Sequence, residues 1–345
     1  MTTVALLVCA AGCASTGPRV SREEITEARQ QLDLKAMEFA FRQTLRVSTV
    51  GYHLVRHLPS GDADERAPFL GLLLTPLDAK IARLYNIPSD VRGAVVVGAV
   101  PESPAAAADV AMGDVITTVN GAPVRSPRTV LNARQHGAPA APVTLTVWRG
   151  QATHDVALQP EFLPLRVAFL MTDDQDINAT AEAGRRVCVT YGLMRFVTAD
   201  DELAVILGHE LAHHTRHHLP KEVGTNILTS VVGLTAAVGA EILVPGIGTP
   251  VMRGVKGAFD STFSQDFERE ADSIGLRYAY AAGYDVDAGR RVWERFAIEV
   301  PRSMTKRLFG THPTSPERLL RMGKMAAALK AGAPSAPDGK MEPEK

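Results

Sequence analysis

Apolar residues recur with a helical period in two parts of the chain, near the N-terminus and over most of the C-terminal half. Ser21 followed by Glu24 is typical of a capping box, and the periodic run to Leu58 predicts one long helix or a pair of helices. Residues 59–68, rich in Gly, Pro and Asp, follow as a linker. Residues 165–331 are again mostly helical by their spacing.

Between these helical parts the pattern changes to short Val-, Leu- and Thr-rich runs separated by Gly, Pro and Asn. The runs predict strands over residues 70–74, 93–99, 114–119, 143–149 and 153–158. Short helices are expected between them, at residues 105–111 and 126–135. The pattern therefore predicts a small, mainly β module.

Short motifs give this module a family resemblance. They are Phe69-Leu70-Gly71-Leu72, then Ser103-Pro104-Ala105 before the first short helix, and Gly113-Asp114 leading to Asn120-Gly121. With these motifs the module resembles a PDZ domain, whose carboxylate-binding loop corresponds to the first of them. The resemblance implies that Phe69, Leu70, Gly71 and Leu72 bind peptide C-termini, with the peptide added as a strand beside the loop.

Composition and charge favour a globular protein of more than one domain and argue against nucleic-acid binding. The chain has 345 residues, of which 46% are hydrophobic, so it can bury a core and hold two domains. Its formal charge is -1, and no Lys- or Arg-rich run is present that could follow a phosphate backbone. We therefore expect no nucleic-acid partner.

The cysteines indicate a processed N-terminus rather than a disulfide framework. Only Cys9, Cys13 and Cys188 are present, and an apolar stretch, residues 4–11, ends in small residues just before Cys13. This arrangement resembles the lipobox of a bacterial lipoprotein. The resemblance implies a periplasmic protein anchored to the outer membrane through a lipidated Cys13.

A candidate metal site lies in a helix that is expected to begin near Thr198. The helix contains His209-Glu210-Leu211-Ala212-His213, and two histidines four residues apart lie on one face, so both imidazoles can reach one ion. A hydrolytic zinc site needs three protein ligands and one open position. A third ligand must therefore come from elsewhere, and Glu210, between the histidines, is the expected general base.

Three candidates for the third ligand can be compared. An extended motif that ends in a further histidine is excluded, because its glycine and histidine positions hold Arg216 and Leu219. His217 shares the helix face but lies two turns along, too far to close a tetrahedron. Glu268, on a later helix, is the best candidate, and Asp272 four residues on could accept the other ring N–H of a ligating histidine.

Several further segments accompany these motifs. They are Asn178-Ala179, residues 184–192, 201–210, 268–272 and 282–284, and Thr311-His312-Pro313. Across residues 177–322 the chain resembles the M48 family of zinc metallopeptidases. The resemblance implies that His312 lies near the metal, as an oxyanion stabiliser or as a latch on the open zinc position. It also implies an edge strand for substrate at Val187, Cys188 and Val189, where Cys188 is expected to be a small packed residue.

The predicted architecture is α+β: a mainly helical zincin-type metallopeptidase domain with a short edge-strand sheet, plus a small mainly β PDZ-like domain. The expected units are a lipoprotein signal and tether (1–19), an N-terminal helical region (20–67), the PDZ-like domain (68–160), the metallopeptidase domain (161–331) and a disordered tail (332–345). With one Zn²⁺ per chain, the expected activity is endopeptidase cleavage of unfolded or misassembled envelope proteins in quality control.

Two other functions remain compatible with these motifs. In one, the protease is latent and the chain acts mainly as a PDZ-type peptide-binding adaptor or chaperone. In the other, it is an aminopeptidase, which would need an acidic pocket for a free amine, and no motif for such a pocket is evident in the sequence.

Overall fold

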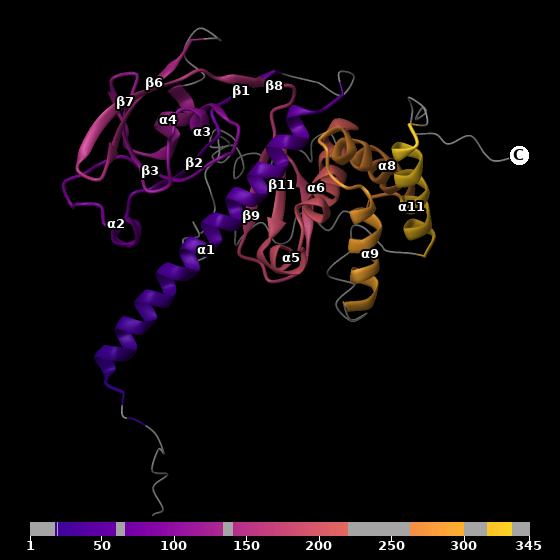
Figure 1. The fold of residues 1–345 in the computed structure, drawn as a ribbon, viewed down its shortest axis with the longest axis horizontal. Helices are drawn as coiled ribbons and strands as arrows, with labels where there is room; N and C mark the ends of the chain where they lie inside the picture. The colour runs from indigo at the N-terminus through magenta and orange to yellow at the C-terminus, as the bar shows by residue number, and fades with distance from the viewer. Residues whose placement is uncertain are drawn as a thin grey trace, which may run out of the picture.

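A computed structural model describes residues 18, 20–59, 66–133, 141–219, 263–299 and 316–332. Cys9, Cys13 and His312 lie outside the described residues, as do most of the expected signal segment and most of the expected tail. In Figure 1 the strands of the β module lie on one side, the helices α8, α9 and α11 lie on the other, and the long helix α1 runs diagonally between them.

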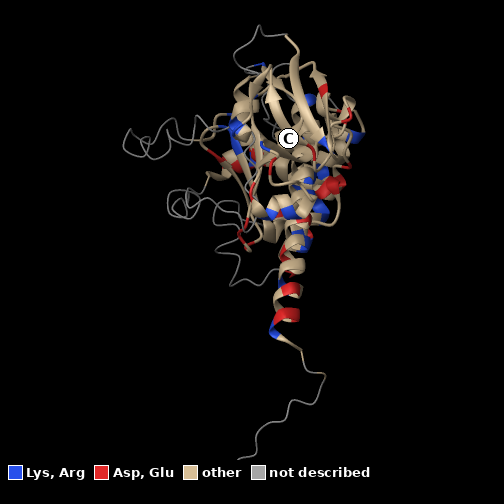
Figure 2. Cartoon of the chain, turned by 90° about the vertical axis from the view of Figure 1, so that its left-hand side faces the viewer, with Lys and Arg blue, Asp and Glu red and all other residues tan. Residues whose placement is uncertain are grey.

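The N-terminal helical region is a single helix, α1 (Arg22–Arg56). Its capping box is present: the Ser21 hydroxyl accepts from the backbone N–H of Glu24 at 3.1 Å, and the Glu24 carboxylate accepts from that of Ser21 at 2.7 Å. The buried residues of α1 lie between Met37 and Val55, so the C-terminal part packs on the protein. The N-terminal part projects from it and contains both acidic and basic residues (Figure 2).

The β module contains a sheet with strand order β2-β3-β4-β6-β7. The strands are β2 (Leu72–Pro76), β3 (Ala94–Ala99), β4 (Val115–Val119), β6 (Val143–Arg149) and β7 (Ala152–Leu158), with the short β5 (Ala122–Pro123) beside β4. The helices are α2 (Ala79–Tyr85), α3 (Pro104–Ala107) and α4 (Pro127–Ala133). The expected strands are therefore present, α3 is shorter than expected, and α2, which Asp78 caps, is an additional helix.

A short ribbon joins the start of the module to its end. Strand β1 (Ala67–Phe69) pairs antiparallel with β8 (Glu161–Leu163), so that Phe69 lies opposite Glu161. The Phe69 ring stacks on Tyr52 of α1 with ring centroids 4.9 Å apart, and the Tyr52 hydroxyl donates to the Glu161 carboxylate at 2.5 Å. The module is thereby attached to α1 next to the expected carboxylate-binding loop.

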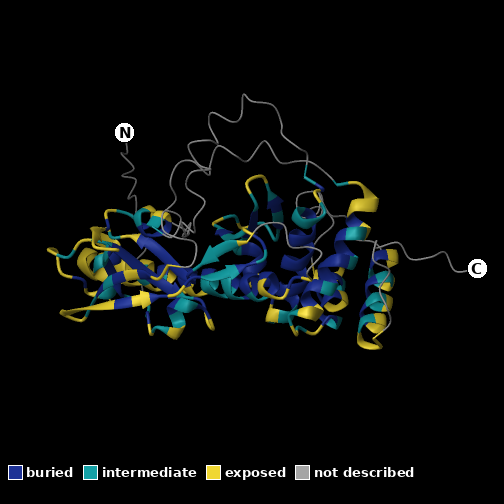
Figure 3. Ribbon diagram, turned by 90° about the horizontal axis from the view of Figure 1, so that it is seen from above, coloured by how far each residue is buried: buried dark blue, intermediate teal, exposed yellow. Residues whose placement is uncertain are grey.

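The remaining residues form a small sheet and a group of helices. The sheet contains β9 (Ala168–Thr172), β10 (Ala179–Glu182) and β11 (Arg186–Thr190), and the helices are α5 (Tyr191–Phe196), α6 (Asp200–Thr215), α8 (Gln265–Ala281), α9 (Asp287–Glu299) and α11 (Pro316–Lys330). Helix α6 is the central element, since every residue from Glu202 to His213 is buried. Buried positions are concentrated where these helices pack together (Figure 3).

Helix α6 begins one residue later than a cap at Thr198 would give, because its N-cap is Ala199. Its first residue is Asp200, and Thr198 lies before the helix, where its backbone N–H donates to the Glu202 carboxylate at 2.8 Å. The first turn of α6 is acidic, with Asp200, Asp201 and Glu202 near the positive end of the helix dipole. None of the described helices combines the length and the apolar character that crossing a membrane requires.

Candidate functional site

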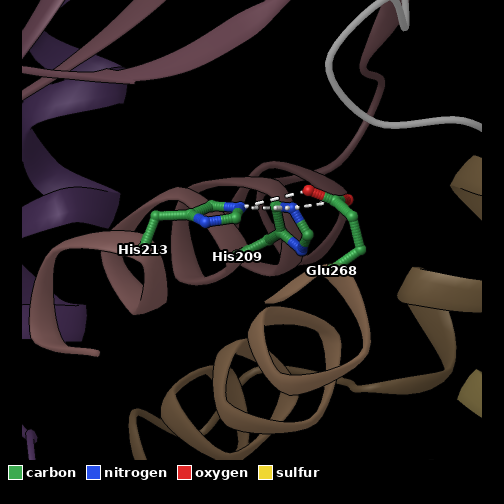
Figure 4. A group of neighbouring side chains, drawn as sticks. All are labelled: His209, His213 and Glu268. Atoms are coloured by element: carbon green, nitrogen blue, oxygen red, sulfur yellow. Dashed lines mark hydrogen bonds and ion pairs between the residues drawn. The ribbon is translucent and has the colours of Figure 1, made fainter. Parts of the chain in front are cut away.

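Helix α6 brings the two histidines of the motif together in the interior of the protein. His209 is 3% exposed and His213 is fully buried, and their Nε2 atoms lie 3.2 Å apart. Because the residues are four apart, the two rings project from the same helix face, one turn above the other. Both Nε2 atoms therefore face one point in space (Figure 4).

Helix α8 brings Glu268 to the same point. Its Oε2 lies 3.5 Å from Nε2 of His209, and its Oε1 lies 3.5 Å from Nε2 of His213. In a tetrahedral zinc site with bonds of about 2.0–2.1 Å, ligand atoms lie about 3.3 Å from one another. The three side chains therefore fit one metal ion of this size, and their donor set of two imidazoles and one carboxylate is one that zinc prefers.

The two helices approach closely because glycines occupy the crossing. A Cβ atom built on Gly208 of α6 would lie 2.6 Å from the carbonyl oxygen of Gly275 on α8. A Cβ built on Gly275 would lie 2.5 Å from the backbone nitrogen of His209. Any larger residue at either position would hold the helices apart, so these glycines set the distance between Glu268 and the histidines.

Asp272 lies beneath His209, one turn of α8 beyond Glu268. Its Oδ1 is 3.0 Å from Nδ1 of His209, so the carboxylate can accept the ring N–H and leave Nε2 directed at the metal position. Burial lowers the pKa of His209, but Glu268 and Asp272 outweigh that effect and raise the pKa to about 10. The pocket therefore stabilises positive charge where the three ligand atoms converge.

Arg318 of α11 is a buried partner of these carboxylates that the sequence patterns did not single out. Its Nε and Nη2 atoms donate to the two oxygens of Asp272 at 2.8 and 2.7 Å, and its Nη1 lies 3.6 Å from Glu268. The guanidinium also lies over the Trp293 ring, 4.1 Å from its centroid. Burial would raise the pKa of Asp272, but Arg318 and His209 hold it below its ordinary value.

Glu210 points from α6 toward the small sheet. Its Oε2 accepts from the backbone N–H of Ala181 on β10 at 2.8 Å, and the side chain is 2% exposed. Among the described strands β10 pairs only with β11, so its other side is an edge, and Glu210 lies against that edge. The expected base thus touches an edge strand.

The expectation that Val187, Cys188 and Val189 form this edge is wrong. They belong to β11, which lies between β10 and β9 and pairs antiparallel with the first and parallel with the second. The backbone groups on both sides of β11 therefore pair with neighbouring strands, and Val187 and Val189 are fully buried. The apolar run was a signal for a central strand, since strands buried on both faces read as continuous hydrophobic segments. Burial raises the pKa of the Cys188 thiol well above its usual value, which fits a packed residue.

The three histidines that follow His213 lie in different surroundings. His217 is not on the face of α6, because the helix ends at Thr215 and His217 is an exposed residue with a φ of 55°. The ring of His214 lies against β11, with Nε2 2.9 Å from the carbonyl oxygen of Arg186, and burial lowers the pKa of His214 to about 4. His218 is buried beside His213, with the two Nδ1 atoms 3.0 Å apart.

The loop expected to bind carboxylates is held firmly by the β module. Gly71 has a φ of +80°, and a Cβ there would lie 1.9 Å from the Ser103 hydroxyl, so the position requires glycine. The carbonyl oxygens of Leu70 and Gly71 accept from Ala105 at 2.9 Å and from Val100 at 2.8 Å. Leu70 and Leu72 are buried in the core of the module, whereas Phe69 contacts α1.

A buried helix that carries two histidines and a glutamate, with a carboxylate from α8 completing a triangle of candidate ligands, is typical of the metallopeptidase class. The model of peptidase family M48 matches residues 147–326, and the chain belongs to this family. A PDZ domain model matches residues 68–159. The prediction of an M48 metallopeptidase with a PDZ domain is therefore confirmed.

Relatives match the chain over less than half its length. This chain is 26% identical over 158 residues to the beta-barrel assembly-enhancing protease of Escherichia coli strain K12. The matched segment covers 44% of this chain and 32% of that protein. The chain is 29% identical over 158 residues to the mitochondrial metalloendopeptidase OMA1 of Schizosaccharomyces pombe, covering 43% of each. The chain thus spans well under two thirds of these relatives. A solved HtrA3 PDZ domain with a phage-derived ligand is 24% identical, with a TM-score of 0.25, over 28% of this chain and 88% of that chain.

Proposed function

We propose that this chain is a zinc-dependent endopeptidase whose metal is held by His209, His213 and Glu268 and whose general base is Glu210. The triangle of side chains formed by His209, His213 and Glu268 carries the proposal. The two Nε2 atoms lie 3.2 Å apart, and each lies 3.5 Å from one of the two Glu268 oxygens, spacings that suit a tetrahedral site. Two imidazoles favour zinc over calcium or magnesium, which take mainly oxygen ligands. Asp272 would hold the ring of His209 in the ligating tautomer.

The protein groups around the triangle fit peptide hydrolysis. Zinc bound there would supply a Lewis acid that lowers the pKa of water and polarises the scissile carbonyl. Glu210 would take the proton of the attacking water and pass it to the leaving amine. His312 lies outside the described residues and is proposed, from the sequence resemblance, as an oxyanion stabiliser or as a latch on the open zinc position.

Strand β10 is the proposed docking edge for substrate, in place of β11. An extended peptide can pair with an exposed strand edge through its backbone, which gives affinity without a fixed sequence. Ala181 of β10 already contacts Glu210, so a peptide alongside β10 would run past the base. This mode suits unfolded or misassembled proteins, because folded substrates do not offer extended segments.

The PDZ domain is proposed to select peptide C-termini through Phe69, Leu70, Gly71 and Leu72. Within the described residues β2 is the last strand of its sheet and pairs only with β3, so an added strand has an edge to join. Helix α4 lies against β2 and would form the other wall of the groove. The relative crystallised with a peptide, the HtrA3 PDZ domain, binds a phage-derived ligand.

The proposed substrates are envelope proteins, and the proposed setting is quality control in the periplasm. One relative is named a beta-barrel assembly-enhancing protease, and another is named a mitochondrial metalloendopeptidase. Anchoring to the outer membrane through a lipidated Cys13 is proposed from the sequence resemblance alone.

The proposal is tested by comparing wild type with Glu210→Gln on an unfolded substrate such as casein. Wild type should bind one zinc per chain and cleave internal bonds, whereas the variant should keep the zinc and lose activity by at least ~100-fold. Glu23→Gln, an exposed carboxylate in the first turn of α1, is the matched control and should behave as wild type. Equal cleavage by the Glu210 variant would remove Glu210 from the role.

The same measurement separates the alternatives. A latent protease acting as an adaptor or chaperone would bind C-terminal peptides but leave casein intact even when loaded with zinc. An aminopeptidase would release single residues from the N-terminus, and its products would be distinguished by mass spectrometry. Internal cleavage that depends on Glu210 supports the endopeptidase.

A further inference from the structure

The turn that ends α6 has an uncommon sequence for its geometry. The N–H of His217 donates to the carbonyl of His214 at 3.2 Å, and the N–H of His218 donates to the carbonyl of His213 at 3.0 Å. These two bonds, with His217 in the left-handed region at a φ of 55°, make a Schellman motif, in which glycine is the usual left-handed residue. The chain therefore reverses tightly just after the second metal-ligand candidate.

This turn folds His218 back over His213. In a Schellman motif the residue after the left-handed position packs on the residue five before it, usually through an apolar contact. Here the contact is polar: Nδ1 of His218 lies 3.0 Å from Nδ1 of His213. The His218 side chain is 2% exposed, and its ring stacks on Phe267 of α8, with centroids 4.3 Å apart and planes 10° apart. The ring is therefore held in one orientation.

Helix α8 supplies the other end of the contact. Nε2 of His218 lies 3.3 Å from Oε2 of Glu270, two residues after Glu268. A carboxylate accepts hydrogen bonds, so Nε2 of His218 carries the proton in this pair and Nδ1 is left as an acceptor. Of two facing Nδ1 atoms only one can donate, and the donor is then His213.

We propose that His218, oriented by Glu270, is a positioning residue that fixes the tautomer of His213. With the proton on Nδ1 and donated to His218, Nε2 of His213 keeps its lone pair toward Glu268 and the metal position. Asp272 does the same for His209, so each of the two histidines has its own hydrogen-bond partner. The two carboxylates involved, Asp272 beside His209 and Glu270 beside His218, both come from α8. The inference rests on the proposed zinc function and deepens it.

The test is zinc affinity, measured by competition with a chromophoric chelator for the full chain. His218→Phe keeps the ring stacked on Phe267 but removes the acceptor, and zinc affinity should fall 10- to 100-fold. Glu270→Gln keeps an acceptor but loses the charge, and a smaller loss of several-fold is expected; this residue is half-exposed, so the variant should fold. His217→Asn, which suits the left-handed position and alters only an exposed ring, is the control and should bind as wild type.

The outcomes separate the two proposals. If wild type binds no zinc, the proposed function fails. If wild type binds zinc and both His218→Phe and Glu270→Gln bind within twofold of it, the positioning role is overturned and the metal site stands. Nitrogen-15 NMR of the zinc-loaded protein gives a second readout: the His213 ring should carry its proton on Nδ1, protected from exchange in wild type and not in His218→Phe. A proton on Nε2 of His213 would contradict the inference.

Discussion

The crossing of α6 and α8 offers the sharpest test of how the site is held. In Gly275→Ala, the new Cβ would lie 2.5 Å from the backbone nitrogen of His209, about 0.9 Å short of the 3.4 Å at which ordinary contact begins. Both atoms belong to backbone or are fixed to it, so no side chain can turn away. The helices must therefore shift by nearly 1 Å, and Glu268 moves with α8.

The expected magnitudes follow from this shift. Ligand distances in a metal site tolerate deviations of about 0.2 Å, so zinc affinity should fall at least ~10-fold, or about 1.4 kcal/mol. Overpacking costs about 1–3 kcal/mol, and the better helix propensity of alanine returns about 1 kcal/mol. The metal-free variant should thus be destabilised by only about 0–2 kcal/mol and remain folded.

Chelator competition gives the zinc affinity, and urea unfolding in the presence of chelator gives the stability. Gly323→Ala in α11 is the control, because a Cβ there meets only the Arg290 side chain, at 3.6 Å. It should leave zinc binding unchanged and be neutral or stabilising by up to about 1 kcal/mol. A folded Gly275→Ala protein that binds zinc as tightly as wild type would refute the claim that the glycine contact sets the ligand distances.

Three other changes test the candidate metal site and the PDZ domain separately. Removing zinc with a chelator should lower the melting temperature, since zinc at 100 times its Kd contributes about 2.7 kcal/mol; calorimetry with no shift would show that the folded chain does not hold the metal. Arg318→Met leaves the Asp272 carboxylate buried without its cation and should cost about 3–5 kcal/mol in urea unfolding. Adding Asp272→Asn to that variant should recover part of the loss, and no recovery would mean that the pair is not the cause. Gly71→Ala should abolish binding of a fluorescent C-terminal peptide in anisotropy measurements while zinc content stays constant, and an amidated peptide should bind neither protein.

Features that depend on local sequence were predictable. The capping box at Ser21 and Glu24, the period of α1 and the alternating runs of the β module are local patterns, and the structure contains the corresponding elements. The common face of His209 and His213 follows from helix geometry alone. The start of α6 was less well defined, because Thr198 bonds Glu202 from outside the helix instead of capping it.

Features that depend on neighbours from distant segments were not predictable. The run around Cys188 predicts a strand, but only the pairing of β11 with both β10 and β9 shows that it is central. His217 and His218 look alike in the sequence, yet the reversed turn exposes one ring and buries the other. Arg318 has no motif of its own, since its role comes from the packing of α11 against α8.

The sequence by itself determined which metal-binding groups are available to this protein: two histidines one turn apart, a glutamate between them and a second acidic segment. Only the tertiary structure decided how close these groups come and what surrounds them. The distance between Glu268 and the histidines is set by two backbones in contact at Gly208 and Gly275, and the orientation of His213 by a turn and a carboxylate on another helix. Ligand spacing within one helix is a local property of the backbone, whereas convergence of two helices depends on packing, which sums contacts from the whole core.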